Sequence, residues 1–337
     1  MSLKNLSAKI KIHKLLKEKL KNKKINQIYK KFERSFKIDE SFIVAVSGGP
    51  DSLALAALAK AYSYEKKCKI YYILIDHNIR KESSVEAKGV KKLLNKQNIS
   101  LNIIKNHRPI NKNIQSQARE IRYDLLSKFC KKKRIKLIVT GHKLEDQVET
   151  FFIRLSRGSG LHGLSSMKKI NEINSKIFVA RPLLNVKKNE LINISKCIFS
   201  KYYKDPSNEN NKYLRTRIRK LKKILEKSGV NYDQIFKSIK NLASSRDTLD
   251  FYFNRIYNDV VVKKKEYLSI SLKKFNNLNQ EMKMRVVNKS IKELTKSYYT
   301  PRSKKTINLV RELEAKKKAK LTLGGCLILM KKNQIII

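Results

Sequence analysis

Residues 42–52 read Phe-Ile-Val-Ala-Val-Ser-Gly-Gly-Pro-Asp-Ser, and this segment is the strongest indication of the fold. The run from Phe42 to Val46 has the composition of a buried strand, and the Ala- and Leu-rich stretch from Leu53 to Ala61 predicts a helix. A tight loop of small residues joins the two and leads into the N-terminus of the helix. Such a loop holds phosphate, because free backbone N–H groups and the helix dipole both favour an anion.

The small residues of this loop suit an anion site. Gly48 and Gly49 let the backbone approach a phosphate closely, and Ser47 and Ser52 add hydroxyl donors. Pro50 fits the first turn of a helix, where no backbone N–H is needed. The loop therefore predicts nucleotide binding by these residues.

Asp51 is the unusual member of the loop, because a carboxylate beside a phosphate is repulsive. A divalent cation between the two groups removes the repulsion, so Asp51 predicts Mg²⁺ bound with the nucleotide. The loop lacks the Gly-Lys-Ser/Thr of a Walker A motif. The alternative interpretation is a plain glycine turn between a strand and a helix.

The charge of the chain favours a polyanionic partner. Its 337 residues include 78 Lys and Arg against 28 Asp and Glu, a formal net charge of +50. Nucleic acid is the usual partner of such a field. Compositional drift towards lysine is the alternative source of the excess, and it leaves the sign of the field unchanged.

Cysteine usage and apolar runs indicate a cytoplasmic protein without a membrane segment. Cys68, Cys130, Cys197 and Cys326 form no Cys-x-x-Cys pair, which argues against a zinc site or a disulfide framework and favours a reducing compartment. Cys68 and Cys130 lie beside apolar runs and are expected to be partly buried. The basic N-terminus lacks the apolar core of a secretory signal, and no run approaches the roughly 20 apolar residues of a spanning helix.

Short apolar strands alternate with longer helices after residue 40. This alternation predicts βαβ units and a parallel sheet with the phosphate loop at its carboxyl edge. The expected strands are 42–47, 69–76, 100–105 and 136–141, and the expected helices are 52–62, 84–97, 114–133 and 144–157.

The pattern weakens after about residue 165. We expect a polar loop over 166–180 that ends in an edge strand at 177–180, followed by a helix at 187–202. Residues 230–300 look mainly helical, and the tail combines a basic helix at 306–320 with an apolar stretch at 321–330.

A second group of polar residues follows the expected strand 136–141. Asp146, Glu149 and Thr150 lie three and four residues apart on one face of a helix. They suit a metal or a substrate amine, and the alternative is that they complement the helix dipole.

Further polar residues stand near the same edge of the sheet. Asp76 and His77 follow the strand 69–76 and could contact a nucleotide or hold the loop. Arg119 and Arg122 share a helix face, which suits paired phosphate contacts.

Three arginines stand at alternating positions in the basic stretch that follows residue 214. Arg215, Arg217 and Arg219 suit binding of a phosphate backbone, and a solvated helix start is the alternative.

Taken together, these motifs resemble the tRNA(Ile)-lysidine synthetase family. The resemblance runs in order from residue 42 to 219 through Ser47–Ser52, Asp76-His77-x-x-Arg80, Ala118-Arg119-x-x-Arg122-Tyr123, Gly141-His142-x-x-Glu145-Asp146-Gln147-x-Glu149-Thr150, Arg157-Gly-Ser-Gly160, Arg181-Pro-Leu-Leu184, Asp205-Pro-Ser-Asn208 and Arg215-x-Arg217-x-Arg219. Two positions depart from the family's usual pattern: Glu145 stands at the first acid of its run, and Asn78 stands where glycine is common.

The resemblance implies an α/β fold, a parallel-sheet N-type ATP pyrophosphatase (adenine nucleotide alpha-hydrolase-like) domain followed by a mainly helical domain and a short C-terminal module. The expected boundaries are 1–40 for a charged helical lead-in, 41–215 for the catalytic domain, 216–300 for the helical tRNA-contacting domain and 301–337 for the short module.

It also implies an activity. ATP activates C2 of the wobble cytidine in a tRNA(Ile) with a CAU anticodon, pyrophosphate leaves, and the ε-amine of free L-lysine displaces AMP to give lysidine. Decoding then changes from Met to Ile. The implied setting is cytoplasmic, and the resemblance leaves open whether the chain forms a homodimer.

The motifs assign roles to particular residues. Ser47, Gly48, Gly49, Pro50, Asp51 and Ser52 are expected on ATP together with Asp76 and His77, with Asp51 and Asp146 at the metal. The expected catalytic residues are Asp51, Arg122, Asp146 and Glu149, where Asp146 and Glu149 are candidates for metal or lysine contact and Arg122 for the activated intermediate. Arg80 and His142 are weaker candidates, and Arg215, Arg217 and Arg219 are expected on tRNA.

Three other functions compete with this one. A tRNA thiolation enzyme would use paired cysteines or an iron–sulfur cluster, and the chain has no Cys-x-x-Cys. A small-molecule synthetase of the GMP or NAD type has no use for a charge of +50. A degenerate RNA-binding module would not need Asp51, Asp146 and Glu149.

Overall fold

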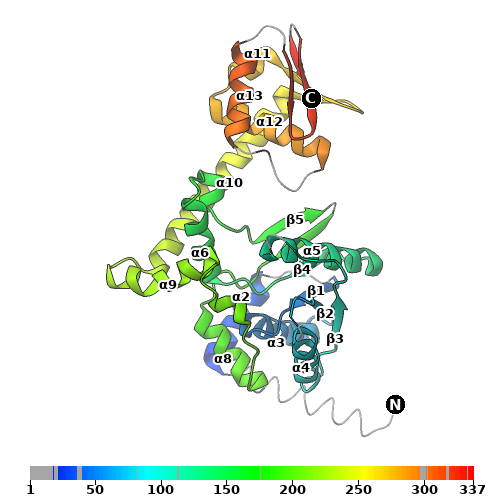
Figure 1. The fold of residues 1–337 in the computed structure, drawn as a ribbon, viewed down its shortest axis with the longest axis vertical. Helices are drawn as coiled ribbons and strands as arrows, with labels where there is room; N and C mark the ends of the chain where they lie inside the picture. The colour runs from blue at the N-terminus through cyan, green and yellow to red at the C-terminus, as the bar shows by residue number, and fades with distance from the viewer. Residues whose placement is uncertain are drawn as a thin grey trace. The chain divides into compact units, whose positions relative to one another are not determined.

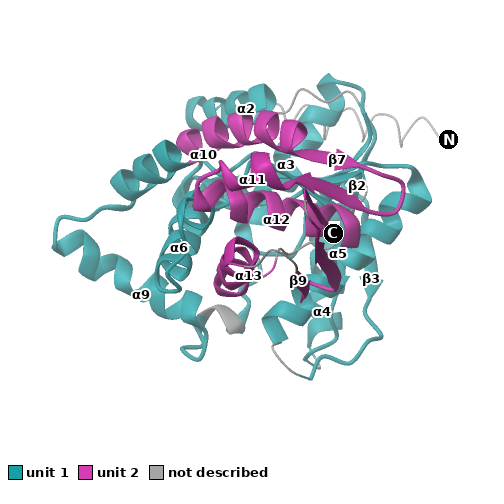
Figure 2. Cartoon of the chain, turned by 90° about the horizontal axis from the view of Figure 1, so that it is seen from above, with its two compact units in different colours: residues 1–242 teal, residues 243–337 magenta. Residues whose placement is uncertain are grey.

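The computed structural model describes residues 18, 22–35, 40–80, 82–111, 114–174, 176–296, 301, 303–315, 319–331 and 333–337. The chain divides into two compact units, residues 1–242 and 243–337, which Figure 2 colours separately. Most of the expected lead-in 1–40 lies outside the described residues, apart from helix α2 (Lys23–Ser35). The four-part division expected from the sequence stays a prediction.

A six-stranded sheet forms the centre of the first unit, with the strand order β3-β2-β1-β4-β6-β5. The strands are β1 (Phe42–Val46), β2 (Ile70–Asp76), β3 (Leu101–Lys105), β4 (Leu137–Val139), β5 (Ile170–Asn174) and β6 (Ile177–Ala180). All neighbours pair in parallel except β5, which is antiparallel to β6. The expected parallel α/β sheet is confirmed.

Both faces of the sheet are covered by helices (Figure 1). Phe42 and Val44 point into a core built with α2, α3 (Pro50–Glu65), α4 (Ser83–Asn95) and α8 (Lys188–Phe199). Ile43 points to the opposite face and packs against Leu126 of α5 (Ile114–Lys133). Since successive side chains alternate across a strand, a strand buried on both faces is apolar at every position, as β1 is.

The sequence did not predict β5. Residues 166–180 were expected to be loop-like with an edge strand at 177–180, but β6 is internal and β5 forms the edge. Ile170 is 51% exposed, so β5 buries little apolar surface. An edge strand that depends on pairing with its neighbour leaves a weak hydrophobic pattern in the sequence.

Shorter helices complete the first unit. They are α6 (Leu144–Leu155), α7 (Leu161–Leu164), the 3₁₀ turn η1 (Pro206–Glu209), α9 (Leu214–Lys227) and the start of α10 (Tyr232–Val260). Leu144 and Val148 of α6 pack with Tyr232 and Phe236 of α10. α6 also packs along α9, which brings the acidic face of α6 to the basic helix.

The second unit has its own core around an antiparallel sheet in the order β7-β8-β11-β10-β9. Its strands are β7 (Val261–Lys263), β8 (Leu268–Ser271), β9 (Ala319–Leu323), β10 (Cys326–Met330) and β11 (Gln334–Ile336), and its helices include α11 (Leu272–Asn276), α12 (Gln280–Thr295) and α13 (Ser303–Ala315). The helix expected at 306–320 is present as α13 but ends at Ala315, and Ala319 and Lys320 belong to β9 instead. The apolar stretch 321–330 forms most of the β9–β10 hairpin. The two strands β7 and β8 were not expected within the mainly helical stretch. No helix among the described residues is both long and apolar enough to cross a membrane.

The strand order places β1 between β2 and β4, where the direction of the chain's progress across the sheet reverses. Ligands of open parallel sheets bind at this switch point, beyond the carboxyl ends of the strands. The loop Ser47–Gly49 after β1 and the loop Thr140–Lys143 after β4 both lie there.

The segment after α8 covers the first of these loops. The backbone N–H of Tyr203 donates to the carbonyl of Gly48 at 3.0 Å. The phenol of Tyr203 lies over Gly89 of α4 so closely that a Cβ on Gly89 would stand 2.1 Å from its hydroxyl oxygen. Gly89 is therefore needed for this close approach, although it lies inside a helix.

We predict that Gly89→Ala destabilises the protein by about 1–3 kcal/mol, because the added methyl group must displace Tyr203. Urea unfolding followed by circular dichroism measures the change. The matched control is Gly160→Ala, where an added Cβ meets nothing within 4 Å. Tyr203→Leu should recover most of the loss in the Gly89→Ala background, and an unchanged loss in the double variant would contradict this account.

Candidate active site

The loop after β1 is held in shape by its own hydroxyl groups. The Ser52 hydroxyl donates to the Gly49 carbonyl at 3.0 Å and accepts from the backbone N–H of Ser47 at 3.1 Å. Gly48 has φ +81°, a conformation that favours glycine. Pro50 begins α3 and Asp51 lies in its first turn, so the helix N-terminus and the serines converge as expected.

The loops after β1 and β4 touch each other through their backbones. A Cβ on Gly141 would lie 2.9 Å from the carbonyl oxygen of Asp51, so only glycine allows this approach. The contact holds the first turn of α3 against the segment that leads into α6.

A buried lysine connects the acids of the two loops. The ammonium group of Lys143 donates to Asp51 Oδ2 at 2.6 Å and to Asp146 Oδ2 at 3.5 Å. The Lys143 side chain is only 7% exposed. Asp146 also accepts the backbone N–H of Lys143 at 3.1 Å, which caps the start of α6.

The surroundings shift the pKa values of this group. Burial raises the pKa of Asp51 above its ordinary value. Burial alone would also raise the pKa of Asp146, but attraction to the Lys143 ammonium outweighs it and lowers that pKa. The two carboxylates in turn raise the pKa of Lys143 against the opposing effect of burial, so it stays an ammonium.

Glu149 is a second buried acid, and two arginines neutralise it. Arg219 binds both of its oxygens, at 2.7 Å from Nε and 3.0 Å from Nη2. Arg215 Nε lies 3.3 Å from Oε2. Glu149 is 2% exposed, and Arg217 points away into solvent. Of the three arginines expected on tRNA, the structure therefore places two on Glu149.

The Asp76 carboxylate holds the turn after β2. It accepts from the Asn78 N–H at 3.0 Å and from the Ser84 hydroxyl at 2.6 Å. Asn78 has φ +53°, which explains why glycine is also suited to this position.

His77 lies beside this turn with both ring nitrogens buried and without a hydrogen-bond partner among the described residues. Burial, with repulsion from Arg122, lowers its pKa to about 4, so the ring is neutral at pH 7. A neutral imidazole with two unused nitrogens can donate one hydrogen bond and accept another.

Arginines of the other motifs surround this edge. Arg122 on α5 is exposed to solvent, yet enough protein lies around its guanidinium for desolvation to lower its pKa from the ordinary value. Arg119 stacks over the ring of Tyr123 at 5.1 Å. Arg80 pairs with Glu86 of α4 at 3.1 Å and with Asp205 at 3.7 Å, so it connects two of the motifs with α4.

Two further motif residues have structural partners. The Glu145 carboxylate accepts the backbone N–H of Lys188 at 2.9 Å and 3.0 Å, which caps the N-terminus of α8. His142 Nδ1 lies 2.8 Å from the Thr140 hydroxyl, and burial lowers its pKa to about 3.

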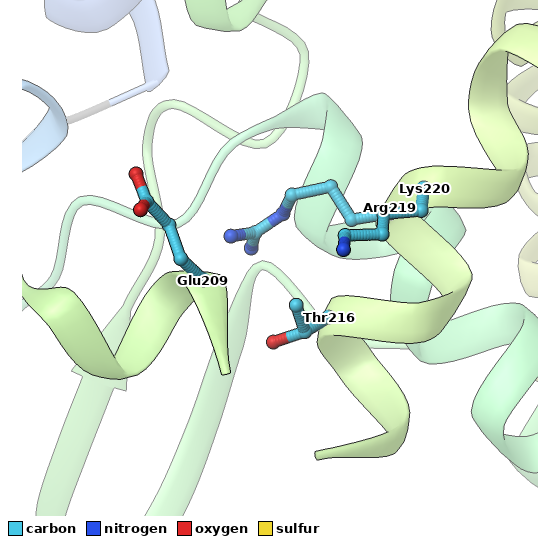
Figure 3. A pocket seen from close by; sticks show the side chains of 4 residues that line it. All are labelled: Glu209, Thr216, Arg219 and Lys220. Atoms are coloured by element: carbon cyan, nitrogen blue, oxygen red, sulfur yellow. The ribbon is translucent and has the colours of Figure 1, made fainter. Parts of the chain in front are cut away.

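A pocket of about 430 Å³ opens next to the Glu149 ion pairs. Glu209 of η1 and Thr216, Arg219 and Lys220 of α9 line it, and Figure 3 shows the Arg219 guanidinium directed across it towards the side of Glu209. Its lining combines one carboxylate with two cations. A volume in this range suits a small molecule.

The sequence did not single out Lys143, Tyr203 or Glu209. Lys143 stands three residues before Asp146, in a segment where the sequence points to the acids. The contact of Lys143 with Asp51 arises from the fold. The contact between Tyr203 and Gly89 joins distant segments, and no local pattern predicts it.

We predict that Arg219→Ala lowers the free energy of unfolding by about 1–3 kcal/mol, because it leaves buried Glu149 oxygens without their donors. Chemical denaturation measures the loss. Arg217→Ala removes the same charge from an exposed site two residues away on α9. Its effect on the free energy of unfolding should stay within about 0.5 kcal/mol. Equal effects of the two substitutions would refute a specific role of the Glu149 pair.

Comparisons with known proteins agree with this geometry. Residues 17–225 match the PP-loop domain family (ATP_bind_3). The tRNA(Ile)-lysidine synthase of Wolbachia pipientis wMel is 35% identical over 301 residues, which cover 87% of this chain and 69% of that protein. The tRNA(Ile)-lysidine synthase of Orientia tsutsugamushi (strain Boryong) is 38% identical over 230 residues, 67% of this chain and 51% of the relative.

Among solved structures, the U34-tRNA thiolase NcsA from Methanococcus maripaludis with its [4Fe-4S] cluster has a TM-score of 0.55. The match covers 65% of this chain and 78% of the thiolase chain at 18% sequence identity, so it shows a likeness of fold only. The match to the PP-loop domain and the identity over most of the chain show the family: this chain belongs to the tRNA(Ile)-lysidine synthases of the PP-loop superfamily.

Proposed function

We propose that the protein ligates free L-lysine to C2 of the wobble cytidine of a tRNA(Ile) with a CAU anticodon, with ATP converted to AMP and pyrophosphate. The observation that carries the proposal is the meeting of the phosphate loop with the acids of α6 at the switch point of the sheet. The family supports ATP as the nucleotide and tRNA as the substrate.

The first step activates the base, and the loop after β1 does this work. The free N–H groups at the start of α3 and the hydroxyls of Ser47 and Ser52 bind the phosphates that leave as pyrophosphate. Arg122 adds a fixed positive charge from α5 for the charge that develops on the leaving phosphate. We assign His77 to the nucleotide, where its two unused ring nitrogens offer one donor and one acceptor.

Mg²⁺ belongs to this proposal, and the residues present fit it. Asp51 Oδ1 is buried and has no hydrogen-bond partner among the described residues, so a ligand that carries positive charge suits it. When bound with ATP, Mg²⁺ neutralises phosphate charge and holds the leaving group in place. One carboxylate oxygen with substrate phosphates is a usual ligand set for this ion.

The second step needs a bound lysine, and we assign it to the pocket beside α9. Free lysine carries two ammonium groups and one carboxylate. Arg219 and Lys220 suit the carboxylate, and the exposed Glu209 suits one ammonium. Glu149 is already neutralised by two guanidiniums, so in this proposal it positions Arg219, while Asp146 is held by Lys143.

The tRNA meets the remaining basic surface. Arg217 is exposed on α9 and is free to contact phosphate, whereas Arg215 and Arg219 are paired with Glu149. The net charge of +50 strengthens binding without sequence preference. A tRNA substrate favours a cytoplasmic location. Whether the chain forms a homodimer is a separate question, which sedimentation velocity tests.

We predict that labelled lysine enters an unmodified tRNA(Ile) CAU transcript only with ATP and divalent metal. Asp51→Ala should lower the rate at least about a hundredfold, because the loop loses its metal-facing carboxylate. Filter binding of the tRNA measures the label. Arg217→Ala should raise KM for tRNA, because an exposed phosphate contact is lost, while the rate at saturating tRNA stays unchanged. Cleavage of ATP without label in the tRNA would keep the adenylation step and reject lysine as the nucleophile.

A further prediction concerns Glu209 in the lysine pocket. Glu209→Gln should raise KM for lysine about tenfold or more, because a charge-assisted hydrogen bond to an ammonium is lost. ATP–pyrophosphate exchange, measured with tRNA but without lysine, should be unchanged. Glu226→Gln changes an exposed acid near the end of α9, outside the pocket, and serves as the control, with no effect on either measurement. An unchanged KM in Glu209→Gln would place lysine elsewhere.

A further inference from the structure

The ammonium group of Lys143 lies between the two acids that the sequence assigns to a metal. It stands 2.6 Å from Asp51 Oδ2 and 3.5 Å from Asp146 Oδ2. All three side chains are largely shielded from solvent, with 7% exposure for Lys143, 26% for Asp51 and 13% for Asp146. The carboxylates of Asp51 and Asp146 therefore already have a cationic partner, the Lys143 ammonium.

This arrangement limits what a metal can do here. Mg²⁺ needs oxygen ligands at about 2.0–2.1 Å in a near-octahedral arrangement. A divalent cation could bridge the facing oxygens of Asp51 and Asp146 only by displacing the ammonium that now binds them. The other oxygen of Asp51, Oδ1, has no partner among the described residues and can accept a metal while Lys143 stays in place.

We propose that Lys143 acts as a built-in competitor of divalent metal for the Asp51–Asp146 pair, which leaves Asp51 Oδ1 as the metal-facing oxygen and weakens metal binding in the absence of nucleotide. Lys143 is a positioning residue in this role, because it acts through the two carboxylates. Metal then enters the site mainly with ATP, whose phosphates supply the missing ligands.

The proposal rests on the proposed function only in identifying Mg²⁺ as the companion of ATP. It differs from the expectation that Asp51 and Asp146 ligate the metal together. In this proposal Asp146 holds Lys143, and through it orients Asp51.

The test measures Mn²⁺ binding to the full chain by electron paramagnetic resonance, without ATP, lysine or tRNA. Lys143→Met should bind Mn²⁺ at least about tenfold more tightly than the unaltered protein, because a unit positive charge next to the carboxylates is gone. Lys143→Arg keeps the charge and should show no gain. Lys187→Met removes the same charge from an exposed pair with Asp233 and should also leave Mn²⁺ binding unchanged.

A second pair of variants tests the proposal without altering Lys143. Asp51→Asn should abolish the weak Mn²⁺ binding, whereas Asp146→Asn should leave it within about twofold. Loss of binding in both variants would mean that the metal bridges the pair, and it would overturn the proposal. So would Mn²⁺ binding in Lys143→Met that is no tighter than in the unaltered protein. Because no substrate is present, either result stands apart from whether lysidine is made.

Discussion

The close approach of Gly141 to the backbone of Asp51 sets the geometry of the whole site. It joins the segment after β4 to the first turn of α3, so the acids of α6 and the phosphate loop act in one place. Any side chain at position 141 would push the two loops apart. The contact is possible because β1 and β4 are neighbours in the sheet, with Val44 opposite Val139.

Buried charge is the second constraint on the site. Asp146 and Glu149 lie on a helix that packs its apolar side against α10, so both carboxylates lose most of their water. Burying an ion is costly unless it is paired and its hydrogen bonds are made. The chain meets this need with Lys143 on one acid and with Arg215 and Arg219 on the other. Such a pair adds little stability compared with an apolar replacement, although removing one partner is costly. The pairs hold charges in fixed directions beside the site.

Arginines form several of the specific ion pairs in this chain, although lysine is the more abundant cation. Arg219 binds both oxygens of Glu149, which a planar guanidinium does and a single ammonium cannot. Arg80 pairs through one nitrogen with Glu86 of α4 and with Asp205. Arg219 therefore fixes both oxygens of one carboxylate, while the exposed lysines of the surface supply diffuse charge for a polyanion.

The sequence by itself determined the parallel sheet, the phosphate loop and the helix that carries Asp146 and Glu149, because each depends on local periodicity and on glycine or proline at particular positions. The burial expected for Cys68 and Cys130 is also confirmed. Only the tertiary structure decided what the charged residues contact. Arg215 and Arg219 belong to a run that suits a phosphate backbone, and the fold pairs both with Glu149. Lys143 is one of many lysines in the sequence, and the fold places it between two acids. The strands β5, β7 and β8 were not predicted for a related reason. They are short, and local hydrophobic patterns do not identify them. Ion pairs and edge strands are contacts between distant segments, and a local pattern holds no record of which segments the fold brings together.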